Sequence, residues 1–145
     1  MVNEQNEELL EQYLSLKKSF TKLHKLAISG ADYNLNNAEI LMIMKLEPDR
    51  ELTLSKLSEV TGFSNTMVTF TVDSLEKKGL IRRIRGNDRR IYYAKLTEKG
   101  KEKYLELREK MRNKISDAFD KLKPEEKEQF SRCVETISAL LDKIT

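Results

Sequence analysis

The chain has 145 residues, of which 39% are hydrophobic and 35% are charged, with a formal net charge of +3 at pH 7. This composition suits one domain with long solvated helices, and because no run approaches the ~18 apolar residues of a membrane span, we expect a soluble, cytoplasmic protein. The single cysteine and the single histidine exclude an intrachain disulfide framework and a His-rich metal site, and no metal or cofactor is expected.

Residues 5–28 predict one long amphipathic helix. Between residues 5 and 28 the apolar side chains recur at intervals of four and three residues, which places them on one stripe. They are Leu9, Tyr13, Leu16, Phe20, Leu23 and Ala27. Gly30 and the polar residues that follow it should end this helix.

A short, very apolar helix is predicted next. Asn36, followed three residues later by Glu39, is typical of a capping box at a helix start. The run that follows, through Leu46, is almost entirely apolar, and Pro48 and Asp49 should end it.

Two further helices, joined by a short turn, are predicted after Pro48. Thr53 is a favourable N-cap for the first of them, and Gly62 suits its C-terminal end because glycine tolerates the left-handed conformation. Ser64 should cap the second helix, which Gly79 should end. Two helices arranged in this way are typical of a helix-turn-helix.

The hydrophobic period then changes from that of a helix to that of strands. Residues 80–84 and 91–96 are short runs rich in β-branched and aromatic side chains. The turn-forming sequence Gly86-Asn87-Asp88 lies between them and predicts a β-hairpin. A hairpin directly after the second helix of a helix-turn-helix is a wing.

The rest of the chain predicts two more amphipathic helices, the first capped by Thr97 and the second opened by Pro124. Together with the first helix they lie outside the central unit, and their apolar stripes must be buried on something. A second copy of the chain is the economical partner, and an intramolecular three-helix bundle is the alternative. Cys133 is expected to be a buried structural thiol.

Positive charge is concentrated around the predicted hairpin. Residues 77–95 contain eight Lys and Arg residues and one acid, Asp88, whereas residues 1–60 contain seven basic and ten acidic residues. Such a local cluster favours a polyanionic partner over an ordinary solvated face.

The outward face of the second helix-turn-helix helix predicts contacts to base edges or phosphates. Its polar residues near the N-terminus are Ser64, Asn65, Thr66 and Thr69. Phe70 either faces outward, where it could contact thymine methyl groups, or joins the core. Of its neighbours, Met67 or Val68 should point inward.

In the wing, Arg85, Arg89 and Arg90 surround the turn. We expect Arg90 to enter the minor groove, whose negative potential attracts guanidinium groups, and Arg89 to contact phosphate. Asp88 should orient Arg90 through a charge-assisted bond. The alternative is an ordinary solvated hairpin with a weak surface ion pair.

These motifs together resemble the MarR (multiple antibiotic resistance regulator) family, over residues ~50–112 in detail. The segments that carry the resemblance are Leu52–Ser58, Ser64–Thr69, Val72–Ile81, Asp88–Arg90 and Leu96–Gly100. The resemblance implies a mainly α protein with a small β-hairpin wing (α+β), a winged helix-turn-helix between long N- and C-terminal dimerisation helices. It divides the chain into residues 1–34, 35–97 and 98–145, of which the central part is the DNA-binding lobe.

The resemblance also implies a triangular homodimer, a roughly palindromic operator in double-stranded DNA, and ligand control through a crevice beside the dimerisation helices. Phe20, His24 and Tyr33 lie near that crevice and are candidate effector contacts, with plain packing as the alternative. Contacts to the DNA backbone are expected from Thr53, Ser55 and Lys56.

Two departures from the family pattern matter. The family often has a basic residue where this chain has Phe70, and Thr where it has Met67, so the operator sequence cannot be taken from relatives. The first helix lacks the cysteine of peroxide-sensing relatives, and one histidine does not match the zinc-sensing ones. What remains is a small organic or lipid-like effector, or no effector at all.

The sequence therefore predicts a DNA-binding transcriptional regulator, a repressor that a small-molecule effector releases from its operator. Catalysis is not expected, since no nucleophile–base pair, metal constellation or phosphate-binding glycine loop is present. The alternatives are a non-specific architectural DNA-binding protein and a winged-helix adaptor for an acidic protein partner.

Overall fold

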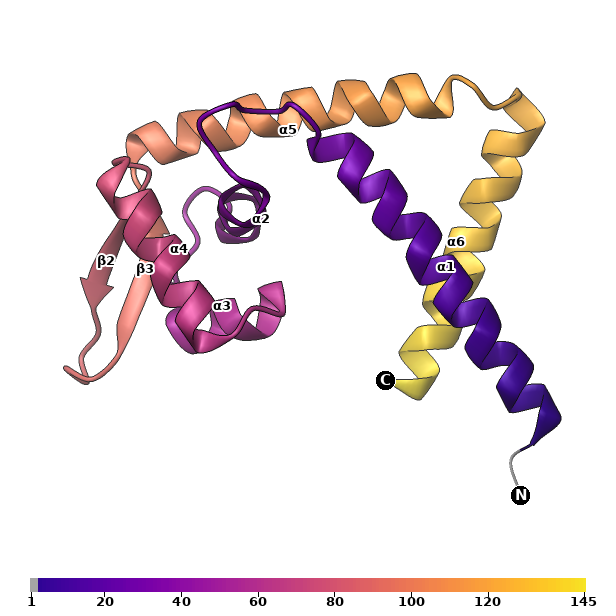
Figure 1. Cartoon of the computed structure of the whole chain (residues 1–145), viewed down its shortest axis with the longest axis horizontal. Coiled ribbons are helices and arrows are strands. Elements are labelled where there is room, and N and C mark those ends of the chain that lie inside the picture. The colour runs from indigo at the N-terminus through magenta and orange to yellow at the C-terminus, as the bar shows by residue number, and fades with distance from the viewer. Residues whose placement is uncertain (1–2) are drawn as a thin grey trace.

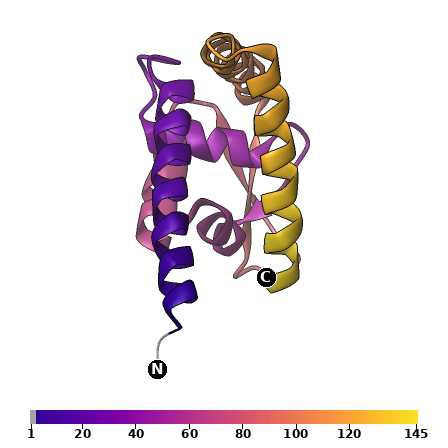
Figure 2. The ribbon, with the colours of Figure 1, turned by 90° about the vertical axis from the view of Figure 1, so that its right-hand side faces the viewer.

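A computed structural model of the chain describes residues 3–145 and divides them between a compact lobe and long helices that extend from it (Figure 1). The elements in chain order are α1 (Glu4–Ile28), α2 (Asn37–Leu46), β1 (Leu52–Thr53), α3 (Leu54–Thr61), α4 (Asn65–Lys77), β2 (Ile81–Arg85), β3 (Tyr92–Leu96), α5 (Glu98–Phe119) and α6 (Pro124–Ile144). The lobe contains α2, α3, α4 and the strands. α5 leads away from it, α6 descends from the far end of α5, and α1 extends from beside the middle of α5 (Figures 1 and 2). The predicted fold class, mainly helical with a small hairpin, is confirmed.

The helix starts lie where the sequence predicts them, because local side-chain caps fix them. Asn36 and Glu39 form the expected capping box at the start of α2. The hydroxyl of Thr53 accepts from a backbone N–H of α3 at 3.0 Å, and the hydroxyl of Ser64 accepts from one of α4 at 3.2 Å. Thr97 caps α5 in the same way at 3.0 Å.

The sheet has one strand that the sequence analysis missed. The β2–β3 hairpin is confirmed, but β1 pairs with the other side of β3, so that Leu52 lies opposite Ala94 and Thr53 opposite Tyr93. A two-residue strand has no alternating pattern of its own, and its assignment depends on the partner strand. β1 joins the start of α3 to the base of the wing.

The core lies between α2, α4, the sheet and the first half of α5. α2 is buried almost all round, which explains why its sequence is apolar on nearly every face. The largest fully buried apolar side chains are Ile40, Met42, Ile43, Leu46, Leu57, Val68, Val72, Leu75, Ile81, Leu96 and Leu107. Because Leu107 and Tyr104 of α5 belong to this core, α5 is anchored in the lobe.

The stripes of α1 and α6 are left largely uncovered in the single chain. Tyr13 is 54% exposed and Phe20 43%, and α6 contains no buried residue. The intramolecular bundle is therefore not formed.

The prediction of a buried Cys133 is wrong for the single chain, because this residue is exposed on α6. Among residues 3–145, no helix combines the length and apolar content needed to cross a bilayer.

Gly100 lies where α5 packs closely against Leu80, the residue before β2. This close packing gives a first prediction. A Cβ at this position would lie 2.0 Å from the carbonyl oxygen of Leu80. We expect Gly100→Ala to lower the free energy of unfolding by about 1–3 kcal/mol, since the backbone must shift to relieve the overlap. Urea unfolding followed by circular dichroism measures this loss. Glu102→Ala, at an exposed position of the same helix, is the control, and equal stability of the two variants would contradict the prediction.

Candidate nucleic-acid interface

One face of α4 is buried and the opposite face is open to solvent. Val68, Thr71, Val72 and Leu75 point into the core, which resolves the choice between Met67 and Val68 in favour of Val68. The predicted contact residues of this region are all exposed, namely Ser64, Asn65, Thr66, Thr69 and Phe70. A shallow hollow runs along this face beside Asn65, Thr66, Thr69, Phe70 and Asp73.

Phe70 lies on the open face and is not a core residue. Its side chain is 67% exposed, whereas Val68 and Val72 on either side are 1% and 0% exposed. The sequence was compatible with a buried or an outward-facing Phe70. Because Val68 and Val72 are buried, the helical phase places Phe70 on the outward face. α4 therefore presents one large aromatic ring within a polar surface.

The wing presents its arginines in two different ways. The Arg85 guanidinium donates to the Tyr92 hydroxyl at 2.7 Å and lies 5.4 Å from the centroid of that ring, so it is held along the hairpin. Arg89 and Arg90 are exposed at the turn, and within residues 3–145 neither has a carboxylate partner. The two groups at the tip are thus available to a phosphate or a groove.

Asp88 does not act as predicted. Its carboxylate accepts from the backbone N–H of Arg90 at 3.0 Å, and no ion pair joins the two side chains in the described part of the chain. This short-range bond stabilises the turn itself, as Asx turns do. The spacing of two residues suits the backbone amide better than the end of a long guanidinium side chain. Asp88 therefore shapes the tip and leaves the Arg90 guanidinium free.

An ion-pair cluster that sequence reasoning missed joins the wing to α4. Arg83 on β2 donates to Glu76 at 2.8 Å and also pairs with Asp73, both on α4. Burial opposes the charge of Arg83, but its bonds to Asp73 and Glu76 outweigh this and raise the pKa of the guanidinium. The cluster fixes the strand to the helix and balances two acids that would repel DNA. It links residues seven to ten positions apart, so only the folded hairpin brings them together.

The basic run 77–95 therefore separates into paired and unpaired groups. Lys78, Arg83 and Lys95 have acidic partners, those of Lys78 and Lys95 being Glu39 and Glu51. In the described chain, the side chains without an ion-pair partner are Lys77, Arg82, Arg85, Arg89 and Arg90. The tip of the hairpin and the N-terminal end of α4 lie on the same side of the lobe, at the lower left of Figure 1. A single elongated polyanion could contact both.

The residues predicted to contact the DNA backbone and an effector are less clearly arranged for these roles than those of α4 and the wing. Thr53 is partly buried and its hydroxyl caps α3, whereas Ser55 is exposed and Lys56 lies 3.1 Å from Glu59. Phe20 and His24 are exposed along α1, and Tyr33 is 99% exposed in the loop after it. Within residues 3–145 no group of three or more His, Cys, Asp or Glu is arranged to hold a metal ion.

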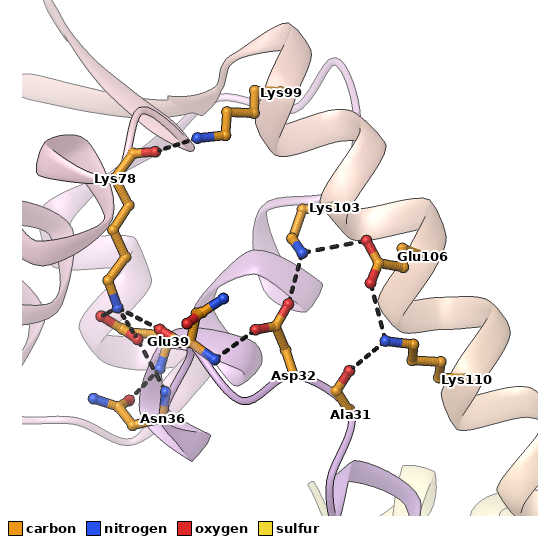
Figure 3. Close-up of polar contacts among 10 residues, drawn as sticks. Ala31, Asp32, Asn36, Glu39, Lys78, Lys99, Lys103, Glu106 and Lys110 are labelled. Carbon is orange, nitrogen blue, oxygen red and sulfur yellow. Dashed lines mark hydrogen bonds and ion pairs between the residues drawn. The ribbon is translucent and has the colours of Figure 1, made fainter.

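A buried carboxylate sets the position of α4 relative to α2 (Figure 3). The side chain of Glu39 is only 2% exposed, and both its oxygens accept from Lys78, at the end of α4, at 2.9 Å. The same carboxylate accepts from Ser74 and from the backbone N–H of Asn36. Glu39 therefore belongs to the capping box of α2 and also binds Lys78 at the end of α4. These bonds hold the start of α2 against the end of α4.

A second contact attaches the loop between α1 and α2 to α5 (Figure 3). Asp32 accepts from Lys103 at 2.6 Å and from the backbone N–H of Asn34 at 2.8 Å, and Lys110 donates to the carbonyl of Ala31 at 2.8 Å. The bond from Lys103 is the largest influence on Asp32 and keeps the pKa of that carboxyl below its usual value. These bonds add polar attachments between this loop and α5 to the core contacts of Tyr104 and Leu107.

The Glu39 contacts predict a pH-dependent contribution to stability. Burial raises the pKa of Glu39, but the bonds from Ser74, Lys78 and Asn36 outweigh burial and lower it below the ordinary 4.5. A lowered folded-state pKa stabilises the fold above the unfolded value, and this stabilisation is lost as the pH falls through the folded value. We expect Glu39→Gln to lose about 1–3 kcal/mol at neutral pH, since Lys78 loses its charged partner.

The loss caused by Glu39→Gln should shrink when unfolding is measured from about pH 6 down to about pH 3. Glu102→Gln removes an exposed carboxylate of α5 that has no ion-pair partner within residues 3–145, and it should leave stability unchanged over this range. A constant difference between Glu39→Gln and the wild type at every pH would show that the charge of Glu39 is not what stabilises the contact.

Comparison with known proteins places the lobe in a recognised group. Residues 35–92 match the family model described as "MarR family". The chain is 32% identical over 105 residues to "Transcriptional repressor MprA" of Escherichia coli (strain K12), an alignment that covers 72% of this chain and 60% of that protein. The chain thus spans about 60% of the length of this curated relative.

Solved structures share the whole architecture. A MarR family protein from Bacillus stearothermophilus superposes with a TM-score of 0.73 at 22% identity, covering 98% of this chain and 99% of that one. Streptococcus pneumoniae FabT, solved in complex with DNA, superposes with a TM-score of 0.68 at 20% identity, covering 97% and 99%. At these identities the likeness establishes the fold, including the long flanking helices.

Proposed function

The chain belongs to the MarR family, and on that premise we propose that it is a homodimeric, sequence-specific DNA-binding transcriptional regulator. We assign residues 35–97 to the DNA-binding lobe and residues 1–34 and 98–145 to dimerisation. The observation that carries the proposal is the unpaired arginine pair at the wing tip, Arg89 and Arg90, on the same side of the lobe as the exposed N-terminal half of α4.

In this proposal α4 enters the major groove, which is wide enough for a helix. The amide of Asn65 suits adenine, and the hydroxyls of Thr66 and Thr69 suit base edges or phosphates. The positive end of the α4 dipole adds an attraction for phosphate. Arg90 enters the adjacent minor groove and Arg89 contacts its phosphates. Thr53, Ser55 and Lys56 at the start of α3 meet the DNA backbone.

Two relatives support this assignment. MprA is described as a transcriptional repressor, and FabT has been solved in complex with DNA. By analogy we propose that the present chain represses transcription at a palindromic operator. A small organic or lipid-like effector, contacting Phe20, His24 or Tyr33, would release it by favouring a spacing of the lobes that mismatches successive major grooves ~34 Å apart.

The dimer follows from the uncovered apolar stripe of α6. Its members are Phe130, Val134, Ile137, Leu141 and Ile144, none of which is buried in the single chain. A helix of this length needs tertiary packing for its stability, and a twofold partner supplies the same stripe in return. Such a dimer would also cover Cys133 on the same helix. Two lobes related by a twofold axis then match two half-sites.

The dimer proposal predicts the effect of a charge within the α6 stripe. Ile137→Glu should convert the protein to monomers at micromolar concentration, because each twofold interface would bury two carboxylates. Analytical ultracentrifugation measures the mass. Glu135→Ala, on the opposite face of α6, should remain dimeric. A dimer of unchanged stability in Ile137→Glu would show that the copies associate elsewhere.

The DNA-binding proposal is tested first by selection from a random pool of duplexes. A specific regulator should prefer its selected site over bulk DNA by a factor on the order of 10³ or more at moderate salt. An architectural protein would bind all duplexes alike, and an adaptor would scarcely bind any. Either result would overturn the proposal.

The wing is tested on the selected duplex by Arg90→Ala. We expect binding to weaken about ten- to a hundredfold, because a groove contact is lost. The thermal unfolding temperature should be unchanged, because within residues 3–145 the Arg90 side chain makes no hydrogen bond or ion pair. Fluorescence anisotropy measures the affinity. Arg112→Ala, an exposed arginine on α5, should bind as the wild type does. Wild-type affinity in Arg90→Ala would remove the wing from the mechanism.

A further inference from the structure

Phe70 is a large apolar side chain on a surface whose other exposed residues, apart from Met67, are polar. Single exposed apolar residues are common on proteins, so exposure by itself carries no inference. The position of Phe70 does support an inference, because this residue lies on the face of α4 opposite the buried stripe. A Phe side chain so exposed to water forgoes most of the free energy that its burial would provide.

The neighbours of Phe70 extend this apolar spot. On a helix, residues three and four positions apart are adjacent, which places Met67 and Thr66 beside the ring on its N-terminal side. Met67 is 38% exposed, and the hollow beside the ring is lined by Thr66, Thr69 and Asp73. Asp73 is the one acid in this hollow, and its pairing with Arg83 balances its charge. The surface can therefore approach DNA closely.

The major groove offers one apolar group to such a ring, the C5-methyl of thymine. We propose that Phe70 contacts this methyl in each half-site and makes thymine a required base there. The inference rests on the proposed function, which supplies the DNA, and it adds the base that the ring selects. It assigns to Phe70 a role in specificity, distinct from the hydrogen bonds of Asn65 and the charge of the wing.

The geometry of α4 also locates the thymine. Phe70 follows Asn65 by five residues, which is about 7.5 Å along the helix axis. Base pairs are separated by about 3.4 Å, so this rise corresponds to about two base pairs, and the turn of about 140° between the two residues directs Phe70 to a different side of the groove from Asn65. The same offset is expected, inverted, in the other half-site.

The experiment removes the methyl group from the DNA and leaves its hydrogen-bonding groups unchanged. In the selected duplex, each thymine is replaced in turn by deoxyuridine, and the affinity of the full-length protein is measured by fluorescence anisotropy. We expect one position per half-site at which the replacement weakens binding about fourfold, the factor for one buried methyl, and about fifteenfold when both half-sites are changed. The other thymines should tolerate it.

A protein variant links that position to the ring. Phe70→Ala should bind more weakly and should no longer distinguish thymine from deoxyuridine there, whereas Phe70→Leu should retain a reduced distinction. Leu105→Ala, which removes an apolar side chain that is 60% exposed on α5, should keep the full wild-type pattern. Thermal unfolding of each variant verifies the fold, and the deoxyuridine scan of the wild type needs no variant.

Two results would overturn the inference while leaving the proposed function intact. The first is a specific complex that is indifferent to deoxyuridine at every thymine. The second is a sensitive position that stays sensitive in Phe70→Ala, because another residue would then contact the methyl. If no duplex is selected at all, the proposed function fails before Phe70 is tested.

Discussion

The interface depends on the burial of one stripe of α4 against the core. Val68, Val72 and Leu75 are almost completely removed from water, and this fixes the rotation of the helix about its own axis. Once that rotation is fixed, every other side chain of α4 has its direction, including Asn65 toward solvent. A polar surface on a helix is useful for recognition only when the core prevents the helix from turning. The apolar side of α4 therefore determines what its polar side can read.

Contacts within the fold also determine which charged side chains remain available to a partner. The basic run near the wing contains groups that stabilise the fold and groups that are left for a partner. Arg83 joins β2 to α4, and Lys78 joins α4 to the buried Glu39, so both are used within the lobe. Arg89 and Arg90 form no ion pair with any acid in residues 3–145. Internal pairing thereby concentrates the unbalanced charge at the tip of the hairpin, where a narrow groove can admit it.

The carboxylates of Glu39 and Asp32 connect this surface to the rest of the molecule. They bind α2 to α4, and the preceding loop to α5, through short bonds from lysines. Because α5 is shared between the core of the lobe and the extended helices, its packing against the lobe sets the direction of the lobe. In the proposed dimer that direction sets the distance between the two copies of α4, and hence the fit to two successive grooves.

The sequence by itself determined the helix boundaries, the hairpin and the exposed polar positions of α4. Those features depend on interactions within about four residues, such as the caps by Thr53, Ser64 and Thr97, or on the period of the apolar side chains. The short sequence pattern also fixed which helix precedes the wing, so the candidate interface was found without the structure.

Only the tertiary structure decided the rest, because the deciding contacts join residues whose distance along the chain carries no local signal. The pairing of β1 with β3 and of Glu39 with Lys78 is of this kind. For Phe70 the sequence permitted two directions, and packing against the core selected one. For Asp88 the charge pattern suggested the Arg90 guanidinium, whereas the turn geometry brought the backbone N–H of that residue nearer. The composition shows how many charged side chains the chain has, but only the fold determines which of them form ion pairs.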